Sequence, residues 1–168
     1  MKTSIPGFYA IGDLAGGKLL AHKASHEGVV AAESVSGLDA RMEYHAVPAA
    51  VFTDPEFASV GMSQEEAERE GTEVKKGIFM LQASGRAVTM GETDGMVKIV
   101  ADKDERLLGA HILAPHAGDM ISELSLAVNK GLHLEDIIST MHIHPTLSEC
   151  LMEAALGARK QSIHALNG

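Results

Sequence analysis

Two histidines immediately precede a predicted helix near the end of the sequence, in the stretch His142-Ile143-His144-Pro145. Imidazole is the side chain whose unperturbed charge change lies near neutral pH, so a histidine can accept and return a proton there. Glu149 follows His144 by five residues, within the first turn of that helix, and its carboxylate could reach one ring nitrogen. Such a contact would fix the tautomer and raise the basicity of the other nitrogen, as a carboxylate does for a general base.

The same glutamate has a second interpretation. Thr146-Leu147-Ser148-Glu149 has the spacing of a capping box, in which the Glu149 carboxylate accepts a hydrogen bond at the helix start. Spacing alone does not separate the two roles. Both therefore stay open: Glu149 orients a catalytic base, or it caps a helix.

The residues that could bind a metal or take part in redox chemistry are better explained as surface or core residues. His22 and His26 are four residues apart, a spacing that places two imidazoles on one helical face and can bind zinc. No acidic residue completes a zinc-protease motif, so we expect a solvated or interface face and no metal site. Cys150 is the only cysteine, which excludes an intramolecular disulfide, a CxxC redox pair and a Cys-rich zinc site. It lies on the apolar face of the last predicted helix, where we expect a core residue.

A glycine-rich turn near the start of the chain is a candidate cofactor contact. The apolar run Phe8–Ile11 ends at Gly12-Asp13, and Gly16-Gly17 precedes a helical pattern. At the end of a strand, Asp13 could contact a ribose or ribityl hydroxyl while the turn's amides approach a phosphate. The sequence has no GxGxxG motif, and Asp13 could equally be a helix or turn cap.

The elements that position these residues fall into two regions. Residues 8–36 indicate a strand, a glycine-rich turn and a helix over Leu19–Ser36 ended by Gly37, which is typical of the last piece of an α/β domain. The later part predicts four strands, namely Ala46–Phe52 (an edge strand, because it contains Pro48), Val74–Leu81, Met96–Ala101 and Leu107–Leu113. It also predicts helices after the capping box at Ser63–Glu66, at Ala117–Lys130, at Leu134–Ile138 and after Thr146. The prediction is an α+β domain over residues 44–168, an antiparallel sheet with flanking helices, preceded by a strand-turn-helix remnant of an α/β domain over residues 1–43.

Composition narrows the class of partner. The 168 residues are 45% hydrophobic and 22% charged, as in a soluble globular protein. A net charge of −9 with no run of Lys or Arg argues against nucleic acid. The sequence shows no secretion signal and no stretch of roughly 18 uninterrupted apolar residues, so we expect no membrane association and a cytoplasmic location.

Several stretches together resemble a known family. They are Ile5–Asp13, Leu20–Ala24, Val51–Glu56, Gly91–Gly95, Leu108–Leu113 and, above all, His142–Glu149. In this order they resemble the C-terminal part of the dihydrolipoamide dehydrogenases, which are flavin-dependent pyridine nucleotide–disulfide oxidoreductases. The resemblance runs from Ile5 to about Leu156 and implies an FAD/NAD-linked reductase dimerisation domain after the end of an FAD-binding domain.

The resemblance implies a role for each matched residue. His144 would be the active-site base, with a cis peptide bond to Pro145, and Glu149 would be its orienting carboxylate. Gly12 and Asp13 would belong to an FAD-contacting motif, while Leu20, Ala21 and His22 would open the helix that approaches the flavin ring. The enzyme would be a homodimer in which the base acts beside the disulfide and flavin of the other subunit.

The implied reaction is oxidation of dihydrolipoamide, free or on a lipoyl-bearing protein, by NAD through FAD and a redox disulfide. The family's paired cysteines, FAD phosphate loop and NAD domain have no counterpart in this sequence. We therefore expect a chain that supplies the dimer interface and the His144–Glu149 pair, does not retain FAD and is inactive alone. Two alternatives stay open: the interface domain of a related enzyme such as glutathione reductase, or a standalone dimerisation module without turnover. Leu147 and Gly91–Gly95 favour the lipoamide enzyme.

Overall fold

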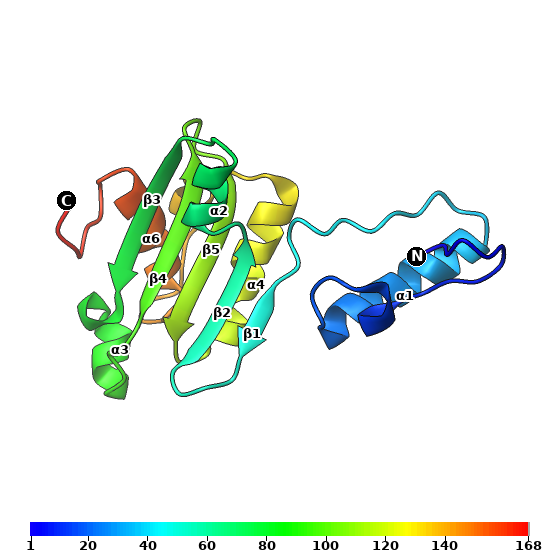
Figure 1. Ribbon diagram of the computed structural model, residues 1–168. Helices are drawn as coiled ribbons and strands as arrows, with labels where there is room; N and C mark the ends of the chain where they lie inside the picture. Colours follow the sequence, from blue (N-terminus) through cyan, green and yellow to red (C-terminus); the bar gives the residue numbers. More distant parts are fainter. Residues whose placement is uncertain (168) are drawn as a thin grey trace. The chain divides into compact units, whose positions relative to one another are not determined.

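The computed structural model describes residues 1–167, and the chain forms two compact units (Figure 1). The first unit is Met1–Tyr44, and the second begins at His45. None of the helices within residues 1–167 combines the length and apolarity that crossing a bilayer needs.

The first unit contains a short 3-10 helix, η1 (Gly12–Ala15), and one long helix, α1 (Ala21–Val35). The predicted helix is confirmed, and Gly37 ends it with a φ of 89°. The predicted strand at Phe8–Ile11 is wrong, because Tyr9 forms only an isolated antiparallel bridge with Lys2. A strand needs a ladder to join, and residues 1–44 contain no sheet, so the apolar run pairs back on the chain's first residues.

The second unit is built on a five-stranded antiparallel sheet with the order β1-β2-β5-β4-β3. The strands are β1 (Ala49–Val51), β2 (Glu56–Gly61), β3 (Val74–Met80), β4 (Met96–Asp102) and β5 (Leu107–Ala114). The predicted hairpin of β4 and β5 is confirmed, and so is the edge position of the strand after Pro48. The predicted α+β class is confirmed.

Strand β2 was not predicted, although it lies between β1 and β5. Only Ala58 and Val60 of this strand are buried, and small or polar neighbours such as Ser59 dilute the apolar pattern. The strand is fixed by its partner, because Ala58 pairs with Ile112 and Val60 with Ala110. Tertiary pairing decides this strand, since β-propensity depends on cross-strand neighbours.

Helices α4 (Ala117–Lys130) and α6 (Glu149–Ala158) cover one face of the sheet, and the short helix α2 (Gln64–Arg69) lies on the other (Figure 1). The remaining helices are α3 (Gly85–Met90), which follows a 3-10 turn, η2 (Leu81–Ala83), and α5 (Leu134–Ser139), which contacts α6. Helix α4 packs on β2 and β5, and α6 packs on β3 and β4. Both helices bury their apolar faces in one core, which includes Leu124, Leu151, Ile99 and Ile112.

Two local features fix helices α2 and α6. Ser63 and Glu66 form the predicted capping box of α2, with the Glu66 N–H donating to Ser63 Oγ at 3.1 Å and the Ser63 N–H to Glu66 Oε2 at 2.8 Å. Helix α6 approaches β3 so closely that a Cβ at Gly77 would overlap the backbone of Ala154 and Ala158. Glycine in a strand commonly marks such a close approach, and here it sets how deep α6 lies on the sheet.

Candidate functional site

The structure brings His144 and Glu149 together. His144 Nδ1 lies 2.9 Å from Glu149 Oε1, across the loop between α5 and α6. The His144 side chain is 80% exposed and the Glu149 side chain 28% exposed. The peptide bond between His144 and Pro145 is cis, as the resemblance implies. Because Glu149 occupies Nδ1, the exposed ring keeps Nε2 for a reacting partner.

Glu149 also contacts the start of α6 with its other oxygen. The Thr146 N–H donates to Glu149 Oε2 at 2.8 Å. The predicted capping box is wrong in its other half, because the Thr146 hydroxyl donates to the Ile143 carbonyl at 2.6 Å and Ser148 occupies the N-cap. The loop turns back on itself before the helix begins, which directs that hydroxyl away from the helix amides. The Glu149 carboxylate therefore makes both predicted contacts, one with each oxygen.

The surroundings of Glu149 favour its charged form. Partial burial raises the pKa of the Glu149 carboxyl, but the hydrogen bonds from the Thr146 N–H and His144 outweigh this, so the pKa lies below its ordinary value. The carboxylate is thus ionised at neutral pH. A charged carboxylate at Nδ1 can stabilise an imidazolium that forms at His144.

His142, the neighbouring histidine, has a different environment. Its side chain is 4% exposed, with Nδ1 at 2.9 Å from the Thr140 carbonyl and Nε2 at 3.1 Å from Glu123 Oε1. Both ring nitrogens are engaged, so His142 tethers the loop to α4. Burial therefore distinguishes the two histidines of the motif, and His144 is the one available for proton transfer.

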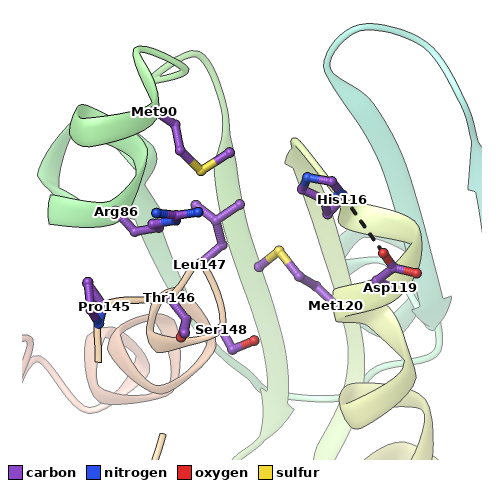
Figure 2. A pocket seen from close by; sticks show the side chains of 9 residues that line it. All are labelled: Arg86, Met90, His116, Asp119, Met120, Pro145, Thr146, Leu147 and Ser148. Carbon is purple, nitrogen blue, oxygen red and sulfur yellow. Dashed lines mark ion pairs between the residues drawn. The ribbon is translucent and has the colours of Figure 1, made fainter. Parts of the chain in front are cut away.

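A pocket of about 370 Å³ adjoins the loop that carries His144 (Figure 2). Its lining comes from three separate segments, namely Arg86 and Met90 of α3, His116, Asp119 and Met120 around the start of α4, and Pro145–Ser148 before α6. Sequence reasoning missed this pocket. No spacing within the sequence connects α3 with α4, since only the sheet brings them together.

The candidate cofactor residues lie in the first unit. The Gly12 N–H donates to Glu27 Oε2 at 2.6 Å, and Gly12 is buried. Asp13 is exposed, and within residues 1–167 its carboxylate makes no hydrogen bond, so it caps neither a turn nor a helix. Leu20 occupies the N-cap of α1, and no side chain there accepts a hydrogen bond from the helix amides. Ala21 and His22 are exposed in the first turn. The unit thus exposes a carboxylate at Asp13 and the amides at the start of α1.

A buried ion pair that sequence reasoning missed holds the glycine turn. Lys23 Nζ lies 3.1 Å from Glu27 Oε1, and both side chains are 1% exposed. Lys23 also donates to the carbonyls of Gly12 at 3.2 Å and Gly16 at 2.7 Å. The Tyr44 hydroxyl donates to Glu27 at 2.8 Å, and this hydrogen bond has the largest effect in lowering the pKa of Glu27. The signal was the Lys–Glu spacing of four residues on a predicted helix.

The remaining candidates have ordinary environments. His26 is exposed on α1, and among residues 1–167 no group of three or more His, Cys, Asp or Glu side chains could hold a metal ion. Cys150 is 1% exposed in the core, as predicted, and burial raises the pKa of its thiol.

Comparison with known proteins decides the family. Residues 47–155 match the model of the dimerisation domain of pyridine nucleotide-disulphide oxidoreductases. The chain belongs to this family. The match covers the sheet, its helices and the His144–Glu149 pair.

Within this family, the chain is similar to curated dihydrolipoyl dehydrogenases. The chain is 50% identical over 167 residues to the dihydrolipoyl dehydrogenase of Halobacterium salinarum, covering 99% of this chain and 35% of the relative. It is 50% identical over 168 residues to that of Thermus scotoductus, covering 99% of this chain and 36% of the relative. It is 48% identical over 158 residues to the human mitochondrial dihydrolipoyl dehydrogenase, covering 94% of this chain and 31% of the relative. The chain thus spans about a third of the length of these relatives.

Solved structures share the fold. LpdA from Mycobacterium tuberculosis superposes with a TM-score of 0.82 at 29% identity, covering 88% of this chain and 32% of that one. The HOCl-induced flavoprotein disulfide reductase RclA from Escherichia coli superposes with a TM-score of 0.81 at 26% identity, covering 88% of this chain and 34% of that one.

Proposed function

We propose that this chain is the part of a dihydrolipoyl dehydrogenase that forms the dimer interface and carries the acid–base pair. The observation that carries the proposal is the contact of 2.9 Å between His144 Nδ1 and Glu149 Oε1 on an exposed loop of the dimerisation domain. The sequence similarity to dihydrolipoyl dehydrogenases over nearly the whole chain supports it. Because these relatives are dihydrolipoyl dehydrogenases, we propose dihydrolipoamide, free or protein-bound, as the substrate of the whole enzyme.

The proposed chemistry begins with a proton. Dihydrolipoamide thiols are poor nucleophiles until they are deprotonated. His144 Nε2 takes the proton of one thiol, and Glu149 holds Nδ1–H and stabilises the resulting imidazolium. The thiolate then attacks an enzyme disulfide outside this chain, and exchange leaves the lipoyl group as a cyclic disulfide and the enzyme as a dithiol. His144 afterwards returns its proton to the sulfur that leaves.

Bound FAD would supply the two-electron acceptor between the enzyme dithiol and NAD. Its fit to this chain rests on Gly12, Asp13 and the start of α1 at Leu20, Ala21 and His22. An exposed carboxylate can accept hydrogen bonds from ribityl or ribose hydroxyls, and helix-end amides can donate to a ring oxygen or phosphate. These groups fit one side of the cofactor. We infer that the chain alone does not retain FAD and has no turnover.

We also propose that the chain forms a homodimer. The loop that carries His144 exposes Met141 to 95% and Ile143 to 77%. Large apolar side chains around a reactive group are typical of a surface that another chain covers. In a dimer with two-fold symmetry, the same surface occurs on both subunits, and each His144 would face the partner.

The test is complementation of a dihydrolipoyl dehydrogenase that lacks its last third. We expect this chain to restore NAD-linked oxidation of dihydrolipoamide, and His144→Gln to abolish that rescue while His26→Gln supports it. Rescue of glutathione reductase instead would favour the rival substrate. A chain that self-associates in sedimentation but rescues neither enzyme is a standalone module. Flavin absorption bands from the purified chain after incubation with FAD would contradict the proposed loss of the cofactor. The expected cytoplasmic location stays a prediction.

A further inference from the structure

The pocket beside the His144 loop has a composition suited to a small amphipathic group. Met90, Met120, Pro145 and Leu147 supply apolar lining, and the volume of about 370 Å³ lies in the range of small-molecule sites. Figure 2 shows Met90 above the opening, Leu147 and Met120 at its centre, and Arg86 at one side. An aliphatic chain can therefore lie against the methionines and Leu147 without a polar mismatch.

Arg86 is the one cation in this lining, and within residues 1–167 its guanidinium makes no ion pair or hydrogen bond. A guanidinium presents five N–H donors and suits a carbonyl or carboxylate oxygen. On the opposite side, His116 Nδ1 lies 3.9 Å from Asp119 Oδ2, so the Asp119 carboxylate has a neighbouring ring nitrogen of its own. The donor without a partner is thus at Arg86, and an oxygen acceptor at the end of an apolar chain would complement it.

The pocket and the acid–base pair share one segment. Pro145 lines the pocket and follows His144 directly, and the Thr146 N–H donates to Glu149. His144 itself does not line the pocket, but its neighbour Pro145 does, so the arm of a thiol at His144 can extend toward this opening. A lipoyl group carries four methylenes and then a carbonyl beyond its dithiolane ring, which matches apolar lining followed by a donor.

We propose that this pocket binds the acyl arm of a lipoyl amide, with the methylenes on Met90, Met120 and Leu147 and the carbonyl oxygen accepting from Arg86. The proposal rests on the proposed function for the identity of the arm. Arg86 would then bind the carbonyl end of the substrate, away from the sulfur atoms that react at His144.

The test uses the chain itself, labelled with 13C at its methionine methyl groups and titrated with lipoamide in NMR. We expect the Met90 and Met120 signals to shift and that of Met62 to stay. Arg86→Met should weaken lipoamide binding about tenfold, as expected for one charge-assisted hydrogen bond. Arg69→Met, which removes an exposed arginine of α2, is the matched control and should leave the affinity unchanged. Arg86→Lys keeps the charge and should give an intermediate affinity.

A probe without the arm tests the pocket in the unaltered chain, so the outcome does not depend on a variant that folds. 1,2-Dithiolane, which has the ring but no acyl arm, should leave the Met90 and Met120 signals in place. Equal shifts from dithiolane and lipoamide would overturn the proposal, because the pocket would then hold the ring. So would absence of any shift at Met90 and Met120, or equal affinity of the Arg86→Met and unaltered chains.

This binding experiment separates the two proposals. It needs no flavin and no turnover, whereas the proposed function is tested by rescue through His144. Rescue without methionine shifts would sink the arm site alone. Methionine shifts that depend on Arg86, without rescue, would leave the arm site and remove the proposed enzyme role.

Discussion

At the scale of single residues, the site depends on one carboxylate with two partners. Glu149 accepts from Thr146 with Oε2 and contacts His144 with Oε1. The sequence allowed both contacts, because Glu149 follows His144 by five residues and Thr146 by three. It could not show that both contacts form together, since that depends on how the loop folds back at Ile143.

Glu149→Gln should destabilise the chain at neutral pH by less than about 1 kcal/mol, since the pair is partly exposed. The pKa of Glu149 is lowered, so its charge stabilises the fold above the ordinary value of 4.5, and this stabilisation disappears as the pH falls through the lowered pKa. Urea unfolding at pH 7 and again well below pH 4 should show the difference between the variant and the unaltered chain shrink. An equal difference at both pH values would contradict the charge-based account.

Cys150 should resist alkylation. It is buried, and burial raises the pKa of its thiol, so little thiolate is available to a reagent. We expect reaction with iodoacetamide at pH 8 to be at least about tenfold slower in the folded chain than in denaturant, because the thiolate is the nucleophile. Equal rates in the two states would show that the helix opens freely.

At the scale of elements, periodicity predicted what is locally encoded. Helices α1 and α4 and the hairpin of β4 and β5 carry clear apolar patterns and turn residues, and all three were predicted. Strand β2 was missed and the strand at Phe8–Ile11 was wrong, because each depends on whether a partner strand is present. The pocket beside His144 was out of reach for the same reason, since α3 and α4 meet only through the sheet.

Gly77→Ala should test the close packing of α6 on β3. A Cβ there would overlap the backbone at Ala154 and Ala158, which cannot move without separating the helix from the sheet. We expect a loss of roughly 2–3 kcal/mol of unfolding free energy, the upper range for overpacking. Gly85→Ala in α3 is the control, because its Cβ would meet open space, and it should be neutral or stabilising by up to about 1 kcal/mol. Chemical denaturation of both variants makes the comparison.

The C-terminal segment should stabilise α6 through Glu153, which is 3% exposed at its side chain. The carboxylate accepts from the Ile163 N–H at 3.1 Å and the His164 N–H at 3.3 Å, and lies 2.8 Å from His164 Nδ1. Removal of residues 162–168 takes these donors from the Glu153 carboxylate, and should cost roughly 1–3 kcal/mol of unfolding free energy. Adding Glu153→Met to the truncated chain should recover much of that loss. A truncated chain as stable as the unaltered one would refute this role.

At the scale of the whole molecule, the two units differ in what holds them together. The second has an extended apolar core, whereas the first buries the Lys23–Glu27 pair together with Gly12, Val30 and Ala31. A charge left alone in such a setting is strongly unfavourable. Polar groups therefore decide the integrity of residues 1–44 more than apolar area does.

Lys23→Met should accordingly disorder the first unit and spare the second. The variant leaves Glu27 buried without its cation and removes donors from the carbonyls of Gly12 and Gly16. Amide hydrogen exchange should accelerate across α1 while α4 and β5 keep their protection. Lys2→Met, which removes an exposed lysine of the same unit, is the control. Loss of protection in both units would mean that they unfold as one.

The solitary, enclosed thiol of Cys150 has a practical consequence for spectroscopy. Because no other cysteine occurs in the chain, a cysteine introduced at an exposed position can take a dye or spin label without removal of the native one. A single label at Met141 would report on an approaching second copy, and a label at Arg41 would report on the first unit from the same background. Each copy of the chain then carries one probe, and distances between copies can be measured in solution.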